Sequence, residues 1–305
     1  VSAYAAVMAV LTTVAATLMV LVPLSDVFDT LFHPHGRGTV SQGLIRGIWR
    51  MMHRLARGNH ALLSLAGPIA FIAVIAVWGG LVVVGFALIL WPHFPEGFTT
   101  AESIGGGGDL ADALYLSLVN LTSLGYGDIV PTAALLRFLG PLETLLGLGL
   151  LTASISWILL LYRVLSDHRS LSQEISLLSE AEDATGIGLT DVQPEVAARI
   201  LADLTSKAVA VHDDLVHSPI AYYFHPRDPR HALPLLLPKL IDVIDVCSQP
   251  DRAPALRFQA GVLRRALDDL LETVAQDFLG AAPGDAAGTL EGYRRDHMWS
   301  PRSPT

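Results

Sequence analysis

The chain has 305 residues, of which 51% are hydrophobic and 16% are charged, and its formal net charge is −9. This composition is too apolar for an ordinary soluble domain and indicates a membrane protein with an added polar portion. The negative charge argues against nucleic-acid binding, and the single cysteine, Cys247, excludes an intrachain disulfide and fits a reducing compartment.

The first apolar segment covers residues 3–22 and is long enough to cross a bilayer. It has no basic start and no small-residue cleavage site, so we expect a membrane span at 1–24 rather than a secretory signal peptide. Residues 37–57 then carry five arginines and no acid, a pattern typical of the cytoplasmic side. We therefore expect a multi-pass protein of the plasma (inner) membrane with its N-terminus outside and its C-terminus in the cytoplasm.

The basic stretch also shows helical periodicity. Apolar residues recur at Leu44, Ile48, Met51 and Leu55, and the arginines form a separate stripe. The pattern predicts an amphipathic helix at the inner membrane surface, within a linker at 25–62. Four of its side chains are expected to contact anionic lipid headgroups: Arg46, Arg50, Arg54 and Arg57. A linker helix with a solvated basic face is the alternative.

Two further spans are expected, at residues 66–91 and 134–162. Pro68 suits the first turn of the earlier span, and Trp91 suits its outer interface. The loop at 92–108 has no Lys or Arg, so we expect it to be extracellular. Arg163 and Arg169 follow the last span, and their positive charge predicts that this span ends on the cytoplasmic side.

Between these spans lies an apolar segment too short to cross a bilayer, at residues 110–122. Asp109 suits its N-cap and Asp112 its first turn, so we expect a short helix. Its negative C-terminal end would favour a cation near residue 122.

The backbone carbonyls of the residues that follow can all point to one side, toward a cation, only if some of these residues adopt left-handed dihedrals. Glycine does so cheaply, which predicts positive φ at Gly125 and Gly127. The Ser123 hydroxyl can add an oxygen at the inner end, and the Tyr126 ring can wedge the segment against its surroundings. Non-helical backbone at this depth must line a water path or be buried in protein.

From residue 66 to 163 the chain resembles the pore module of bacterial two-transmembrane potassium channels. The resemblance rests on Gly125-Tyr126-Gly127-Asp128, followed by Pro131, Arg137 and Gly147 at comparable distances. Ser123 and Leu124 stand where the family has threonine and valine, and Tyr115 and Leu116 stand where it often has tryptophans. The implied potassium filter consists of Thr122, Ser123, Leu124, Gly125, Tyr126, Gly127 and Asp128, with K⁺ held at Ser123, Leu124, Gly125 and Tyr126.

The resemblance implies an all-α fold with a pore module at 63–165. Because a filter needs four strands and each chain supplies one, it also implies a homotetramer. Gly147 and Gly149 are candidates either for a gate hinge or for close helix packing. Glu143 is placed near mid-membrane, where an ionisable side chain faces a partner or water. We expect Asn120 or Thr122 beside it, with a role in filter gating.

The remaining chain carries most of the net negative charge and is expected to be a helical cytosolic regulatory domain at 166–280, followed by a flexible tail at 281–305. Helices are predicted at 166–183, 193–216, 231–247 and 253–279, the third interrupted by Pro234 and Pro238. No GxGxxG is present, which argues against a nucleotide-type regulatory domain. His212-Asp213, with His217, His225 and His231 nearby, suggests a metal-hydrolase alternative.

The sequence therefore predicts a potassium-selective channel without enzymatic activity or cofactor, gated by or through the cytosolic domain, whose ligand is unknown. Three alternatives stay open: a weakly selective cation channel, a membrane-bound metal-dependent hydrolase with a vestigial pore, and a non-conducting scaffold.

Overall fold

The computed structural model describes residues 2–31, 38–100, 108–282 and 284–299. The described residues are almost entirely helical, so the all-α expectation is confirmed. The chain divides into two compact units, one comprising residues 1–33, 37–44 and 71–159 and the other residues 34–36, 45–70 and 160–305. Among the described residues, three helical segments are long and apolar enough to cross a membrane: Val10–Leu31, His60–His93 and Ala134–Thr185.

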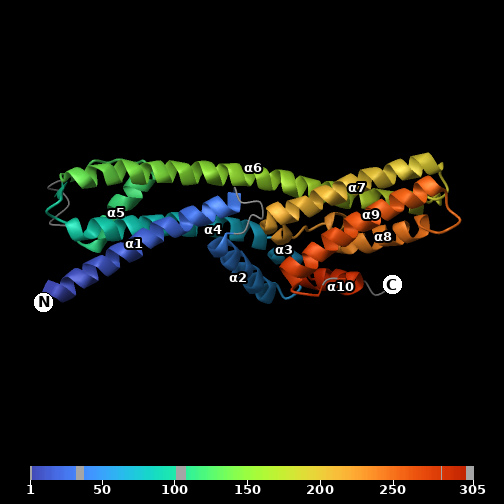
Figure 1. Ribbon diagram of the computed structural model, residues 1–305, viewed down its shortest axis with the longest axis horizontal. Helices are drawn as coiled ribbons and strands as arrows, with labels where there is room; N and C mark the ends of the chain where they lie inside the picture. Colours follow the sequence, from blue (N-terminus) through green and yellow to red (C-terminus); the bar gives the residue numbers. More distant parts are fainter. Residues whose placement is uncertain (1, 32–37, 101–107, 283, 300–305) are drawn as a thin grey trace. The chain divides into compact units, whose positions relative to one another are not determined.

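The first unit contains the long helix α1 (Ser2–Leu31), which packs against α4 (Ala66–Leu90). A Cβ at Gly85 would lie 2.7 Å from Val20 Cγ2 and 2.9 Å from the Ala16 carbonyl oxygen. The glycine therefore allows the two helix backbones to approach closely, as small residues do in membrane proteins. Figure 1 shows α1 and α4 in blue and teal.

The end of α1 differs from the expectation, because the helix continues past residue 22 and buries Asp26, which is 2% exposed. Its carboxylate accepts hydrogen bonds from the backbone N–H groups of Val40 and Ser41, at 2.8 and 2.9 Å, in the first turn of α2 (Thr39–Ala56). It also accepts a bond from Trp78 Nε1 at 2.8 Å. Asp26 thus caps α2 from another helix and stabilises its positive N-terminal end.

The amphipathic helix predicted in the basic stretch is confirmed as α2, but its buried face differs from the predicted one. The buried apolar side chains include Ile48, while Met51 and Leu55 are 50% and 60% exposed. The other buried members of this face are Ile45, Trp49, Met52 and Ala56. The buried face is therefore rotated from the stripe read in the sequence, because Trp49 and Met52 pack within the second unit.

The short helix α5 (Leu110–Leu121) begins as predicted, since Asp109 accepts from the backbone N–H groups of Ala111 and Asp112 at 2.9 and 3.0 Å. Two strands not foreseen from the sequence flank it: β1 (Phe98–Thr100) pairs antiparallel with β2 (Ile129–Pro131), with Thr99 opposite Val130. This strand pair packs on a small core, and it holds together the two ends of the loop that contains α5. This core consists of Leu90, Phe98, Leu116, Ile129 and Leu136.

The helix α6 (Ala134–Thr185) runs without a break where the sequence predicted a span ending at 162 and a separate helix at 166–183. No glycine or proline occurs between Gly149 and Gly186, so nothing in the chain ends the helix earlier. Gly186 then terminates it with a left-handed φ of 68°.

The second unit is a helical bundle in which α7 packs on α9, and α9 packs on α8 and α10 (Figure 1). Its longer helices are α7 (Pro194–His217), α8 (Leu233–Cys247), α9 (Pro254–Thr273) and α10 (Ala286–Asp296). Shorter elements of the chain are α3 (His60–Leu63), η1 (Trp91–His93), η2 (Pro219–Tyr223), η3 (Pro229–His231) and the π-helical η4 (Val274–Leu279).

Two expectations for this region are wrong. The prolines do not interrupt α8, because Pro234 lies in its first turn and Pro238 removes only one hydrogen bond near the start of a well-buried helix. The expected flexible tail contains α10, whose Leu290 and Tyr293 are 9% and 5% exposed. Burial of these side chains orders a segment whose composition alone looks too polar to fold.

Candidate functional site

The loop after α5 has an alternating backbone. Ser123, Gly125 and Gly127 have φ values of 60°, 60° and 77°, so every second residue is left-handed. This confirms the predicted dihedrals of the two glycines. Ser123 is an addition that the sequence did not reveal, since a left-handed conformation costs a non-glycine residue roughly 1–2 kcal/mol. The alternation can turn successive carbonyls to one side, which an ordinary strand does not do.

The loop is anchored to the helix before it. Ser123 N donates to the Asn120 carbonyl at 3.0 Å, and Leu124 N donates to the Val119 carbonyl at 3.0 Å. The Thr122 hydroxyl turns back to the Leu118 carbonyl at 2.7 Å. The negative end of α5 therefore passes directly into the alternating segment, as expected for a site that favours a cation.

Residues 122–127 are all exposed within one chain. The Tyr126 side chain is 66% exposed and Leu124 is 54% exposed. The wedge expected from Tyr126 is therefore not formed within a single chain. Apolar side chains on α6 are also exposed, including Leu135 and Phe138 at 68% and 75%.

The outer end of the loop is tied to α5 by a contact that the sequence did not suggest. Tyr115 Oη donates to Asp128 Oδ2 at 2.5 Å, and Asp128 Oδ1 accepts from Ile129 N at 3.1 Å. Tyr115 stands at a position where the resembling family often has tryptophan, and here its hydroxyl provides the bond. The filter-like segment is thus held at both ends.

Glu143 is fully buried, at 0% exposure, and it lies between α5 and α6. Asn120 Nδ2 donates to its Oε2 at 3.1 Å, and the Ser117 hydroxyl contacts its Oε1. The expectation of Asn120 as a neighbour is confirmed, whereas Thr122 bonds elsewhere. Ser117 Oγ also lies 2.9 Å from the Val83 carbonyl. A single hydroxyl proton cannot serve two acceptors, so a proton on the carboxyl would complete this chain of contacts.

The two glycines of α6 have different surroundings. A Cβ at Gly147 would overlap the backbone carbonyl oxygen of Leu121, whereas a Cβ at Gly149 would have nothing within 4 Å. Gly147 thus lets α6 pack directly against the C-terminal end of α5, which supports the packing interpretation at this position. Close to this contact lies an apolar cavity of about 390 Å³ lined by Trp78, Leu121, Ser123 and Leu151 among others.

The metal-hydrolase alternative finds no support in the described residues, which contain no group of three or more His, Cys, Asp or Glu that could hold a metal ion. His212 Nε2 lies 3.0 Å from the Thr273 hydroxyl, and its Nδ1 lies 3.9 Å from Asp213 Oδ1. His217 Nδ1 bonds to the Asp213 carbonyl at 2.7 Å. These side chains are thus used in local contacts between and along helices.

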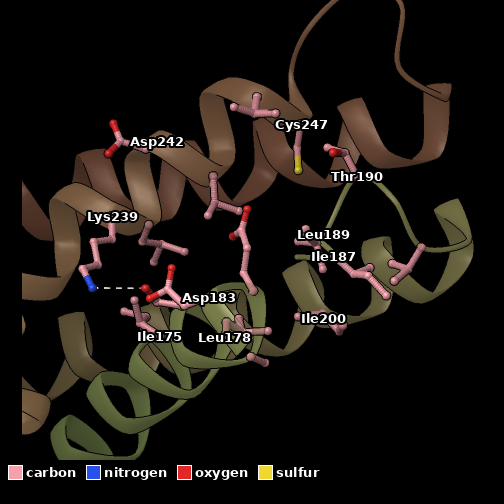
Figure 2. A pocket seen from close by; sticks show the side chains of 18 residues that line it. Ile175, Leu178, Asp183, Ile187, Leu189, Thr190, Ile200, Lys239, Asp242 and Cys247 are labelled. Carbon is pink, nitrogen blue, oxygen red and sulfur yellow. Dashed lines mark hydrogen bonds between the residues drawn. The ribbon is translucent and has the colours of Figure 1, made fainter. Parts of the chain in front are cut away.

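The second unit contains a cavity of about 560 Å³ between the end of α6, the following loop and α8. Figure 2 shows Lys239 and Cys247 of α8 on one side and Ile175, Leu178 and Asp183 of α6 on the other. Lys239 Nζ donates to Ser179 Oγ at 3.1 Å. Cys247 is fully buried, and burial raises the pKa of its thiol, so it packs as a small apolar residue.

Comparison with known proteins finds a match for the segment that contains the alternating loop. Residues 72–162 match the family model described as ion channel. This segment is therefore similar to ion channels. The matched segment includes most of α4, the strands β1 and β2, α5, the alternating loop and the first half of α6.

A curated relative supports the membrane assignment. The uncharacterized membrane protein YdjJ of Bacillus subtilis (strain 168) is 27% identical over 176 residues, which cover 57% of this chain and 50% of YdjJ. The chain therefore spans about half the length of that relative. No solved structure matches the chain. The pore module, the three candidate spans and this relative together indicate a multi-pass membrane protein.

Proposed function

We propose that the protein is a potassium-selective channel that conducts passively through a homotetrameric pore. The observation that carries the proposal is the left-handed alternation at Ser123, Gly125 and Gly127 within the pore module. It can direct the carbonyls of residues 123–126 to one side, where they replace the water around a dehydrated K⁺ ion. The permeant ion is the only metal that the proposal requires.

The exposure of the filter supports the tetramer. Extended backbone at membrane depth must be buried in protein or line water, and one chain leaves residues 122–127 exposed. Four copies around one axis would bury Tyr126 and the exposed apolar side chains of α6 between chains and would place the carbonyls around the ion path.

The proposal extends to topology and regulation. The N-terminus lies outside and the C-terminus in the cytoplasm of a plasma (inner) membrane, in keeping with the arginines of α2. Four exposed side chains contact anionic headgroups: Arg46, Arg50, Arg54 and Arg57. The cytosolic helices gate the pore.

Flux into liposomes tests the conduction proposal. We expect the purified protein to pass K⁺ much faster than Na⁺ and to have the mass of four chains in native mass spectrometry. Equal K⁺ and Na⁺ flux would favour a weakly selective cation channel instead. A tetramer with no flux under any gating condition would favour a scaffold, and a dimer or trimer would contradict a four-strand filter.

Glu143→Gln should keep the tetramer but change how the filter gates or responds to pH. The amide preserves the shape of the side chain beside Asn120, but it cannot gain or lose the proton that the contact with Ser117 accommodates. Single-channel open times from about pH 5 to about pH 8 measure this effect. If open times of variant and wild type coincide across that range, Glu143 has only a structural role.

A further inference from the structure

The cytosolic unit contains a second cavity, of about 350 Å³, that is surrounded by cationic and imidazole side chains. It lies between α6, the segment from η2 to α8, and α10. Its basic and imidazole residues are His168, Arg169, His225, Arg227, His231 and His297. Asp228 is the one carboxylate among the lining residues, so the wall carries an excess of positive charge and of N–H donors.

Several nitrogens in this wall lack partners. His225 and His297 are 4% and 2% exposed, yet His225 Nδ1 and both ring nitrogens of His297 have no hydrogen-bond partner among the described residues. The same is true of His168 Nε2. Buried polar atoms are nearly always paired, because an unpaired one costs free energy on folding. Four unpaired nitrogens around one cavity are therefore positions where a bound molecule can supply the missing partners.

The carboxylates near the cavity already have hydrogen-bond partners. Asp228 accepts from Arg230 at 2.9 Å, and Arg230 holds the pKa of this carboxyl at about 2. Asp296 accepts from Tyr222 Oη at 2.7 Å and from Trp49 Nε1. The remaining titratable groups that face the cavity histidines are Tyr293 of α10, His53 of α2 and His60 of α3, whose Nδ1 lies 2.9 Å from His225 Nε2.

The histidine protonation states follow from this arrangement. Burial, with His60 adding repulsion, lowers the pKa of His225 to about 4. Burial, with His225 and His53 adding repulsion, also lowers the pKa of His297 well below its usual value. A nearby negative charge would oppose both effects and favour protonation. An anion in the cavity would thus gain hydrogen bonds and take up protons at once.

We propose that this cavity binds a small anion that carries a phosphomonoester group. Arg169 and Arg227 stand exposed at the cavity and can grip phosphate oxygens with their planar forks, while the histidines donate from the buried wall. The aromatic residues Tyr222, Phe224 and Tyr293 line the rest of it and suit the apolar or planar part of such a molecule. The volume lies at the small end of the range for ligand pockets, roughly 300–1,000 Å³.

Isothermal titration of the full-length protein in detergent and phosphate-free buffer tests the proposal. Adenosine monophosphate and glycerol 3-phosphate should bind saturably, whereas adenosine and glycerol should not. Micelles doped with phosphatidate form a parallel arm, since a lipid headgroup presents the same phosphomonoester. Binding of phosphatidate alone would identify a lipid as the source. Binding in no arm, or equal binding of adenosine and its monophosphate, would overturn the proposal.

Variants locate the site. Arg169→Gln and Arg227→Gln should each weaken phosphomonoester binding about tenfold or more, the usual loss for a charge-assisted hydrogen bond. Lys239→Gln is the matched control, because it removes one cation from the other cavity of the same unit and should leave the affinity unchanged. Equal affinity of the two arginine variants and wild type, or an equal loss in Lys239→Gln, would place binding elsewhere.

The pH dependence of anion affinity tests the histidines directly, because histidines with a purely structural role would not change it. Because a bound anion raises the pKa values of His225 and His297, which burial holds below their usual range, affinity should increase as pH falls. Sulfate is the probe for this arm, since its charge stays constant from about pH 5 to about pH 8. His297→Asn should remove part of the pH dependence while the protein keeps its circular-dichroism spectrum. Sulfate affinity that is independent of pH would contradict the role of the histidines.

Discussion

Gly125→Ala is expected to abolish potassium flux while leaving the tetramer assembled. Gly125 has a φ of 60°, and a Cβ added there has nothing within 4 Å in its own chain. The effect therefore comes from the backbone, since a left-handed alanine costs roughly 1–2 kcal/mol in each chain. In the proposed tetramer four chains would share one ion path, so the strain would be repeated four times around it. Relief of the strain turns a carbonyl away from the ion.

Gly186→Ala is the matched control for this prediction. Gly186 has a φ of 68° and open space around its Cβ position, but it lies just after α6 in the second unit. The substitution carries a similar backbone strain without touching the filter, so flux per tetramer should remain. Liposome flux and native mass spectrometry of both variants measure the contrast. Wild-type flux in an intact Gly125→Ala tetramer would contradict the assignment of this loop as the filter.

The parts of the site that depend on local sequence were predictable. Asp109 caps the helix that it immediately precedes, and Gly125 and Gly127 adopt the dihedrals that glycine alone adopts cheaply. Each of these features is decided by a residue and its nearest neighbours. The spans follow in the same way from runs of apolar residues.

The parts that depend on distant contacts were not predictable. Asp26 falls in the linker predicted at 25–62, and its burial could not be foreseen because its partners lie on α2 and at Trp78, 52 residues away. The bond from Tyr115 to Asp128 and the contact of Ser117 with Glu143 likewise join separate elements. The left-handed conformation of Ser123 is fixed by backbone hydrogen bonds at the end of α5, and serine has no intrinsic preference that would predict it.

The two strands were missed for a different reason. The strands β1 and β2 have three residues each, which is too short for an alternating pattern to be read. The cavities of the second unit form where helices far apart in sequence meet, so the sequence indicated a helical domain without indicating its cavities. His225 and His231 were noticed as metal ligands, whereas the structure places them with two arginines.

Gly147→Ala is expected to destabilise the pore module strongly, because the added Cβ overlaps the backbone carbonyl of Leu121. A backbone atom cannot move aside as a flexible side chain can, so α5 must separate from α6. Overpacking of this kind typically costs about 1–3 kcal/mol, and here it also displaces the helix that anchors the filter. We expect a lower thermal midpoint in detergent together with loss of selective flux.

Gly149→Ala distinguishes packing from hinge motion. Its Cβ has open space within the chain, and alanine is favoured over glycine inside a helix by roughly 1 kcal/mol, so stability should be unchanged or slightly higher. If Gly147 were instead needed only as a hinge, Gly147→Ala would retain the wild-type thermal midpoint and alter open probability alone. A large midpoint decrease confined to Gly147→Ala therefore assigns this glycine to the contact between α6 and the pore helix, and an equal decrease in both variants would contradict that assignment.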